Sequence, residues 1–205
     1  MPRAFTQHEK ELIRGRLLDG GYQLFSAYGL KKTNVEELAE AAGISKGAFY
    51  NFYPSKEALF MDVMELAESR FREEILPLVE TETGAPRARL FAILKKAFAG
   101  MENIPLLQSI TSKDYDLLSR RVSPEQLNEH MASDRVFIEE LIARCKGAGI
   151  PIQVEVEEMR SLLYALVLTK LHEEDFGPYQ LNGVIEVMLE LVAAYCLGEI
   201  ELQAG

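Results

Sequence analysis

The sequence predicts an all-α protein, and three observations lead to that prediction. Apolar residues recur at the three- and four-residue spacings of helix faces along most of the 205 residues. Ser or Thr stands before several of these periodic segments, where its hydroxyl can cap a helix. Short apolar runs such as 150–154 do not alternate with polar residues as a half-buried strand does. We therefore expect about nine helices and no sheet.

The first predicted helix covers residues 8–28, in which Leu17 and Leu24 lie seven residues apart on one face. Gly29 is expected to stop it. Gly20 and Gly21 lie inside this helix, where each glycine costs about 0.8–1 kcal/mol relative to alanine. We expect that cost to be offset by close packing of another segment against them.

Capping residues set the starts of the next helices. A capping box, Thr or Ser followed three residues later by Glu or Gln, satisfies two free backbone N–H groups. The predicted N-caps are Thr6 (with Glu9), Thr33 (with Glu36), Ser45, Ser55 and Ser123 (with Pro124 and Gln126). They begin helices at 8–28, about 34–42, 46–52, from 56 to near Pro77, and 124–146, and further helices are expected at 87–102, 154–174 and 180–198.

The helices at 154–174 and 180–198 are apolar nearly all round. A surface helix of a globular protein needs only one apolar stripe, so the excess predicts burial on two sides. Either these are central helices of a monomer, or they form the interface between two copies of the chain.

Charge is unevenly distributed along the sequence. Residues 1–56 hold eight Lys and Arg against six Asp and Glu, a net charge of +2. The other 149 residues hold 14 against 26, a net charge of −12. An excess of +2 is small enough to arise by chance, but the acidic remainder would repel phosphates. Any contact with nucleic acid is therefore expected from the amino-terminal segment.

Catalytic and metal-binding patterns are not found in the sequence. His8, His130 and His172 are far apart, and none belongs to a pair with metal-ligand spacing. There is no G-x-S-x-G, G-x-G-x-x-G or P-loop motif. Cys145 and Cys196 are expected to be small buried apolar residues. We expect no enzyme activity, no cofactor and no metal site.

Residues 33–56 carry the strongest functional pattern, two short capped helices joined by a turn at Gly43. This is the spacing of a helix-turn-helix, whose second helix enters the DNA major groove. Leu38, Ala39, Ala42, Ile44 and Phe49 can form its inner face. The residues left free to face the groove are Ser45, Lys46, Gly47, Ala48, Tyr50 and Asn51.

This segment resembles the TetR family of bacterial transcriptional regulators. The matching residues are A-x-x-A-G-I-S-x-G-x-F-Y from Ala39 to Tyr50 and S-K-E-x-L from Ser55 to Leu59. With the preceding helix, the resemblance covers about residues 8–62, and the rest of the chain agrees only in helix content.

The resemblance implies a helix-turn-helix DNA-binding domain in residues 1–54 and a helical effector-binding and dimerisation domain in residues 55–205. It implies a homodimer that binds a palindromic operator, represses transcription and is released by a small molecule. Thr33 and Lys56 would hold phosphates, while Ser45, Lys46, Gly47, Tyr50 and Asn51 would lie at the groove. The dimer would form through the helices at 154–174 and 180–198.

Two positions depart from the family pattern. Phe52 stands where the family often has His or Tyr, and Phe52 cannot donate a hydrogen bond. Tyr53 stands where the family often has Phe. Its hydroxyl either contributes a DNA contact from this neighbouring position, or its ring simply packs inside.

An effector pocket is expected among the helices at 87–102, 124–146 and 154–174. Its candidate lining residues are Phe91, Leu94, Phe98, Met101, Met131, Phe137, Tyr164 and Leu168. Such residues at helical spacing also make ordinary core. If they form a pocket, the effector is hydrophobic or aromatic, and a lipid-like chain is one option.

The alternative from another class is a partner-binding or adaptor protein whose helix-turn-helix is structural. An enzyme on a helical scaffold would lack any catalytic constellation. No apolar run approaches the roughly 18–20 residues of a membrane span. The first residues contain no apolar signal core, so we expect a cytoplasmic protein that does not bind membranes.

Overall fold

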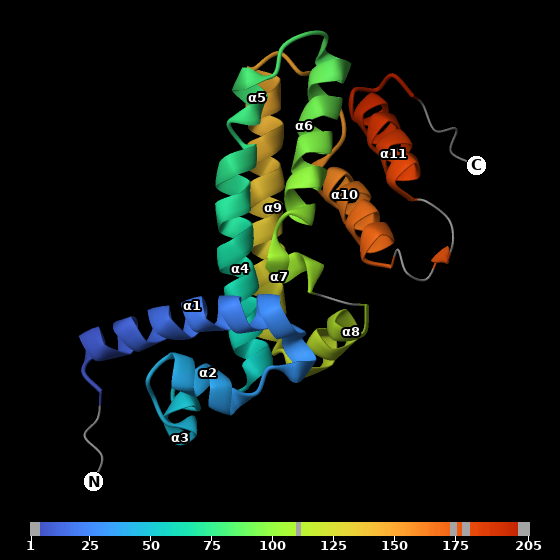
Figure 1. Cartoon of the computed structure of the whole chain (residues 1–205). Helices are drawn as coiled ribbons and strands as arrows, with labels where there is room; N and C mark the ends of the chain where they lie inside the picture. Colours follow the sequence, from blue (N-terminus) through green and yellow to red (C-terminus); the bar gives the residue numbers. More distant parts are fainter. Residues whose placement is uncertain (1–4, 110–111, 173–175, 178–180, 201–205) are drawn as a thin grey trace. The chain divides into compact units, whose positions relative to one another are not determined.

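The computed structural model describes residues 5–109, 112–172, 176–177 and 181–200 (Figure 1). Every regular element in these ranges is a helix, so the predicted all-α fold is confirmed. The helices are α1 (Gln7–Lys32), α2 (Val35–Ala41), α3 (Lys46–Phe49), α4 (Lys56–Ile75), α5 (Leu78–Thr81), α6 (Pro86–Glu102), α7 (Pro105–Gln108), α8 (Ser112–Arg121), α9 (Pro124–Gly147), α10 (Val156–Leu171) and α11 (Leu181–Cys196).

Three of these helices, α5, α7 and α8, are not among those predicted from the sequence, and others differ in length. Helices α5 and α7 are four residues long, too short for a periodic pattern to reveal. Helix α8 lies in a segment for which the sequence predicted no helix. Helices α10 and α11 are each shorter than expected, and residues 173–175 and 178–180 lie outside the described ranges. None of the described helices combines the length and apolar character needed to cross a membrane.

The chain packs as two compact units. Unit 1 comprises Met1–Glu68 and Asn103–Leu127, and unit 2 comprises Ser69–Glu102 and Asn128–Gly205. Each unit has its own cluster of buried apolar residues. The predicted functional boundary after residue 54 describes a different division, and it stays a prediction.

Unit 1 is organised around α1. A complete capping box begins this helix: the Thr6 hydroxyl accepts from Glu9 N at 3.2 Å, and the Glu9 carboxylate accepts from Thr6 N at 2.7 Å. Near its other end, Gly29 takes φ 75° and ψ 169°, so the chain leaves helical geometry there as expected. One further turn, through Lys32, follows the kink.

The two mid-helix glycines of α1 mark its closest contacts. A Cβ on Gly20 would lie 2.8 Å from the Cβ of Ala41 on α2. A Cβ on Gly21 would lie 3.0 Å from Cγ2 of Val63 on α4. Both glycines are buried, so the expected close packing is confirmed.

The start of α9 also belongs to unit 1. The Ser123 hydroxyl accepts from Gln126 N at 3.2 Å, as its predicted N-cap role requires. The Gln126 side chain does not complete a capping box. It donates instead to Ala58 O and to Asp62 Oδ1, both at 2.9 Å and both on α4.

Unit 2 places α6 beside α11, and α10 beside α11 (Figure 1). Ion pairs cross the first of these contacts: Arg87 pairs with Glu190 at 2.9 Å, and Lys95 pairs with Glu186 at 2.5 Å. Cys145 and Cys196 are fully buried in the core of this unit, as expected.

Candidate nucleic-acid interface

The first helix of the predicted helix-turn-helix begins one residue later than expected. Its N-cap is Asn34, whose Oδ1 accepts from Glu37 N at 3.0 Å, while the Glu37 carboxylate accepts from Asn34 N at 3.1 Å. The predicted cap, Thr33, is fully buried. Its hydroxyl donates to Gly29 O at 2.9 Å, with Leu24 O at 3.3 Å also within reach. The predicted capping role of Thr33 is therefore wrong.

The turn between α2 and α3 has the predicted geometry. Gly43 takes φ 70°, a conformation that a side chain would resist. Ile44 N donates to Ala39 O at 2.9 Å, which folds the chain back onto α2. Ser45 then caps α3, since its hydroxyl accepts from Ala48 N at 3.2 Å.

One side of helix α3 is exposed to solvent, and the other side is buried against α2. Phe49 is fully buried, together with Leu38, Ala39 and Ala42 from α2. Ala48 and Ile44 are half-buried. The residues predicted to meet the groove are otherwise exposed: Ser45, Lys46, Gly47, Tyr50 and Asn51. The helix is a single turn that ends at Phe49, rather than the longer helix expected to Phe52.

Lys46 is held on this surface by a carboxylate of α2. Its Nζ lies 2.5 Å from Oε1 of Glu36, and more than half of each side chain is exposed. The hydrogen bond with Lys46 lowers the pKa of Glu36, and the same bond raises the pKa of Lys46. Lys46 therefore stays protonated, but Glu36 competes with any phosphate for its ammonium group.

Tyr53 packs inside, which is the second of the two roles considered for it. The residue is 4% exposed, and its hydroxyl donates to Asp62 Oδ2 at 2.9 Å. Burial, followed by the charge of Asp62, raises the pKa of Tyr53 well above its ordinary value. The guanidinium carbon of Arg14 lies 6.0 Å from the centre of the ring. The structure thus agrees with the packing alternative, and a DNA contact by Tyr53 stays a prediction.

Lys56 also has internal partners. Its Nζ donates to Leu30 O at 2.7 Å, Thr33 O at 2.7 Å and Lys31 O at 3.2 Å. The Thr33 hydroxyl is buried and the Lys56 side chain is half-buried, so both side chains make hydrogen bonds within unit 1. The DNA contacts predicted for Thr33, Tyr53 and Lys56 stay predictions.

Arg16 on α1 is a candidate that the sequence pattern did not single out. Its Nη1 lies 3.8 Å from where a Cβ on Gly43 would stand, so a cation lies over the turn of the helix-turn-helix. The residue is exposed. In the sequence it is one of several basic residues in α1, and only the fold distinguishes it from the others.

The predicted effector residues differ in how deeply they are buried. Leu94 is buried in the core, Phe91, Phe98 and Phe137 pack against that core, and Met101 and Leu168 are half-buried. Met131 and Tyr164 are exposed. A shallow groove between α6 and α11 is lined by Phe91, Gly183, Glu186, Val187, Glu190 and Leu191. The pocket thus stays a prediction, with Phe91 as the one predicted residue in this groove.

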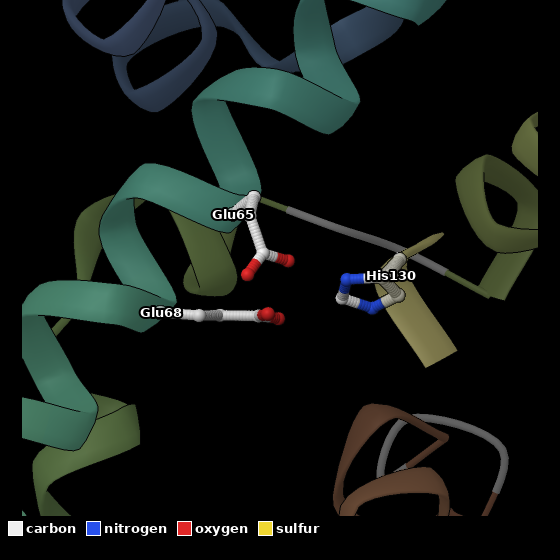
Figure 2. Close-up of side chains that lie close together, drawn as sticks. All are labelled: Glu65, Glu68 and His130. Atoms are coloured by element: carbon white, nitrogen blue, oxygen red, sulfur yellow. The ribbon is translucent and has the colours of Figure 1, made fainter. Parts of the chain in front are cut away.

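Other titratable groups show no catalytic arrangement among the described residues. Glu65 and Glu68 project from neighbouring turns of α4 (Figure 2). Two carboxylates at this spacing do not by themselves form a cation site, and His130, drawn with them, belongs to unit 2. Burial raises the pKa of Cys145 and of Cys196 to about 11, which disfavours their reactive thiolate forms.

Comparison with known proteins identifies the amino-terminal segment. Residues 17–63 match the family described as "Bacterial regulatory proteins, tetR family". The regulator AcrR of Shigella flexneri is 36% identical over 89 residues, 43% of this chain and 41% of that protein. The repressor Rv1474c of Mycobacterium tuberculosis is 32% identical over 91 residues, 42% and 48% of the two chains. The chain thus spans less than half the length of these two curated relatives.

Longer matches extend over both units at lower identity. The regulator RutR of Escherichia coli is 26% identical over 176 residues, 79% of this chain and 74% of that protein. Among solved structures, a TetR-family repressor FadR of Thermus thermophilus is 24% identical, with a TM-score of 0.64 over 94% of this chain and 97% of that one. FadR of Bacillus halodurans is 16% identical, with a TM-score of 0.58 over 93% and 97%. These structures support the same fold over most of this chain.

Proposed function

From the membership of residues 17–63 in the tetR family of bacterial regulatory proteins, we propose that this chain is a DNA-binding regulator of transcription, acting as a repressor. One observation carries the proposal: α3 is anchored by buried Phe49 and capped by Ser45, while Lys46, Tyr50 and Asn51 are exposed beside it. A lysine can bind a phosphate or a guanine edge, and Asn can bind adenine.

The proposed DNA contacts come from one edge of unit 1. They are Ser45, Lys46, Gly47, Ala48, Tyr50 and Asn51, with Arg16 added from α1. Gly47 has only the Ser45 hydroxyl within 4.0 Å of its Cβ position, so a DNA backbone could approach it closely. A homodimer would present two such edges, and the matching operator would be palindromic.

The proposed dimer uses α10 and α11. Val184, Val187 and Leu191 are 49%, 59% and 51% exposed, and their spacing places them on one face of α11. Tyr164 on α10 is 44% exposed. A second copy of the chain would cover this apolar surface, as helical dimer interfaces do.

The proposed effector is a molecule with a long acyl chain. Solved structures of similar fold include FadR of Thermus thermophilus in complex with lauroyl-CoA and FadR of Bacillus subtilis in complex with stearoyl-CoA. Unit 2 offers apolar side chains at the edge of its core, including Phe91, Phe98 and Phe137. Apolar linings of this kind suit a hydrocarbon chain.

A salt series with DNA from upstream of the gene tests the function. We expect the wild type to bind with an affinity that falls steeply with salt, because lysine and arginine displace counterions. Lys46→Met should make the negative slope of log K against log [salt] less steep by about one. Stearoyl-CoA, but not free coenzyme A, should release the DNA. An adaptor protein with a structural helix-turn-helix would instead show no specific binding and no slope change.

A further inference from the structure

Lys56 lies at the end of α1, although the sequence places it at the start of α4. An ammonium group has three N–H donors and no acceptor. All three can be used here, since Nζ contacts Leu30 O, Thr33 O and Lys31 O at 2.7, 2.7 and 3.2 Å. A DNA phosphate could bind this group only by displacing a carbonyl.

These carbonyls need a partner because α1 is interrupted just before them. The last carbonyls of a helix have no intrahelical donor. At this end, Gly29 O accepts from Thr33 N at 3.3 Å and from the Thr33 hydroxyl at 2.9 Å. Lys56 supplies the donors for the carbonyls of Leu30 and Lys31 that follow. A cation at a helix carboxyl end is also favoured by the helix dipole.

We propose that Lys56 is a positioning residue for the DNA-binding surface and not a phosphate ligand. It holds Thr33 O, and the next residue, Asn34, is the N-cap of α2. Through that junction Lys56 fixes the direction in which α2 and α3 leave α1. The proposal rests on the DNA-binding function proposed above.

Charge and capping geometry can be separated by two substitutions. Lys56→Arg keeps the positive charge, but a planar guanidinium cannot direct its donors as a compact ammonium does toward three converging carbonyls. Lys56→Met keeps the length of the side chain and removes both charge and donors. Lys46→Met serves as the control for loss of a phosphate contact.

If Lys56 positions the DNA-binding surface, Lys56→Arg and Lys56→Met both weaken DNA binding by about tenfold. The reason is that fewer molecules then hold α2 and α3 in the orientation that binds DNA. The salt slope of both variants then equals that of the wild type, whereas Lys46→Met lowers it by about one. The proposal is overturned if Lys56→Arg binds like the wild type and Lys56→Met lowers the slope by about one.

Amide hydrogen exchange at residues 30–35 gives a readout that needs no DNA. We expect faster exchange there in both Lys56 variants, and unchanged exchange in Lys46→Met. Unchanged amide exchange rates in the Lys56 variants would refute the proposal that Lys56 caps the end of α1. If the wild type binds no DNA, the proposed function fails, while the exchange result still decides the role of Lys56. Should Lys56→Met not fold, Lys56→Gln, which keeps two donors without charge, takes its place with the same expected slope.

Discussion

The polar side chains of the helix-turn-helix differ in where their hydrogen-bonding atoms go. Thr33, Tyr53 and Lys56 direct theirs to partners within unit 1. Tyr50 and Asn51 are exposed, and Lys46 is exposed but paired with Glu36. The residues predicted to contact DNA thus divide into a set with internal partners and a set on the surface.

Removal of the Tyr53 hydroxyl should destabilise the protein without disturbing the ring packing. Tyr53→Phe leaves Asp62 Oδ2 without its hydrogen-bond donor. Hydrogen bonds to charged groups contribute about 1.5–3 kcal/mol, so we expect the free energy of unfolding at pH 8 to fall by about that amount. Urea unfolding measures it. Tyr50→Phe is the matched control, because Tyr50 is half exposed and its hydroxyl makes no hydrogen bond among the described residues.

The same variant has a predicted pH dependence. The pKa of Tyr53 is raised in the folded protein, so its contribution is fully present below the ordinary tyrosine pKa of about 10 and is lost as pH rises above it. Between pH 8 and pH 10.5, the free energy of unfolding of the wild type should fall by about 0.8 kcal/mol more than that of Tyr53→Phe. Equal losses in the two proteins would contradict the raised pKa.

At the scale of helices, the sequence predicted the elements better than their junctions. Thr33 and Asn34 are both good N-caps, and each has a glutamate three residues later. Only the burial of Thr33 beneath the end of α1 decides between them. Likewise, no local pattern could show that Lys56 contacts carbonyls more than 20 residues earlier in the chain. Local capping rules find a helix start to within a residue, and tertiary contacts fix the rest.

Two glycines of α1 should respond oppositely to alanine. Gly20→Ala brings a Cβ to 2.8 Å from that of Ala41, so α1 and α2 must separate. We expect a net loss of about 1–3 kcal/mol in the free energy of unfolding, as overpacked sites show. Gly15 is the matched control on the same helix, since nothing lies within 4 Å of its Cβ position. Gly15→Ala should stabilise by about 0.5–1 kcal/mol through helix propensity alone.

The reverse exchange identifies the cause of the Gly20 effect. Adding Ala41→Gly to Gly20→Ala restores the space between the two helices, so part of the lost stability should return. Urea unfolding of the single and double variants gives the coupling free energy between residues 20 and 41. Additive losses would mean that the 2.8 Å approach is not what makes Gly20 necessary.

For the whole molecule, charge distribution was readable from sequence, whereas the exposed surface of the last helix was not. The excess of acids outside residues 1–56 leaves those first 56 residues as the part of the chain suited to DNA. The sequence showed that α11 is apolar nearly all round, but not which side chains the subunit leaves uncovered. The structure identifies Val184, Val187 and Leu191. Glu186 and Glu190, which flank this stripe, are neutralised by Lys95 and Arg87 of the same chain.

Paired charges beside an apolar stripe favour contact with a second copy, because the glutamates then cost little in mutual repulsion. Val187→Lys with Leu191→Lys places unpaired cations in that contact, and we expect sedimentation equilibrium to change from twice the chain mass to the chain mass. DNA affinity should fall with it, since a monomer meets one half-site. Val136→Lys, at a residue 61% exposed on α9, is the control and should remain dimeric. A double variant that stays dimeric would place the subunit contact elsewhere on the chain.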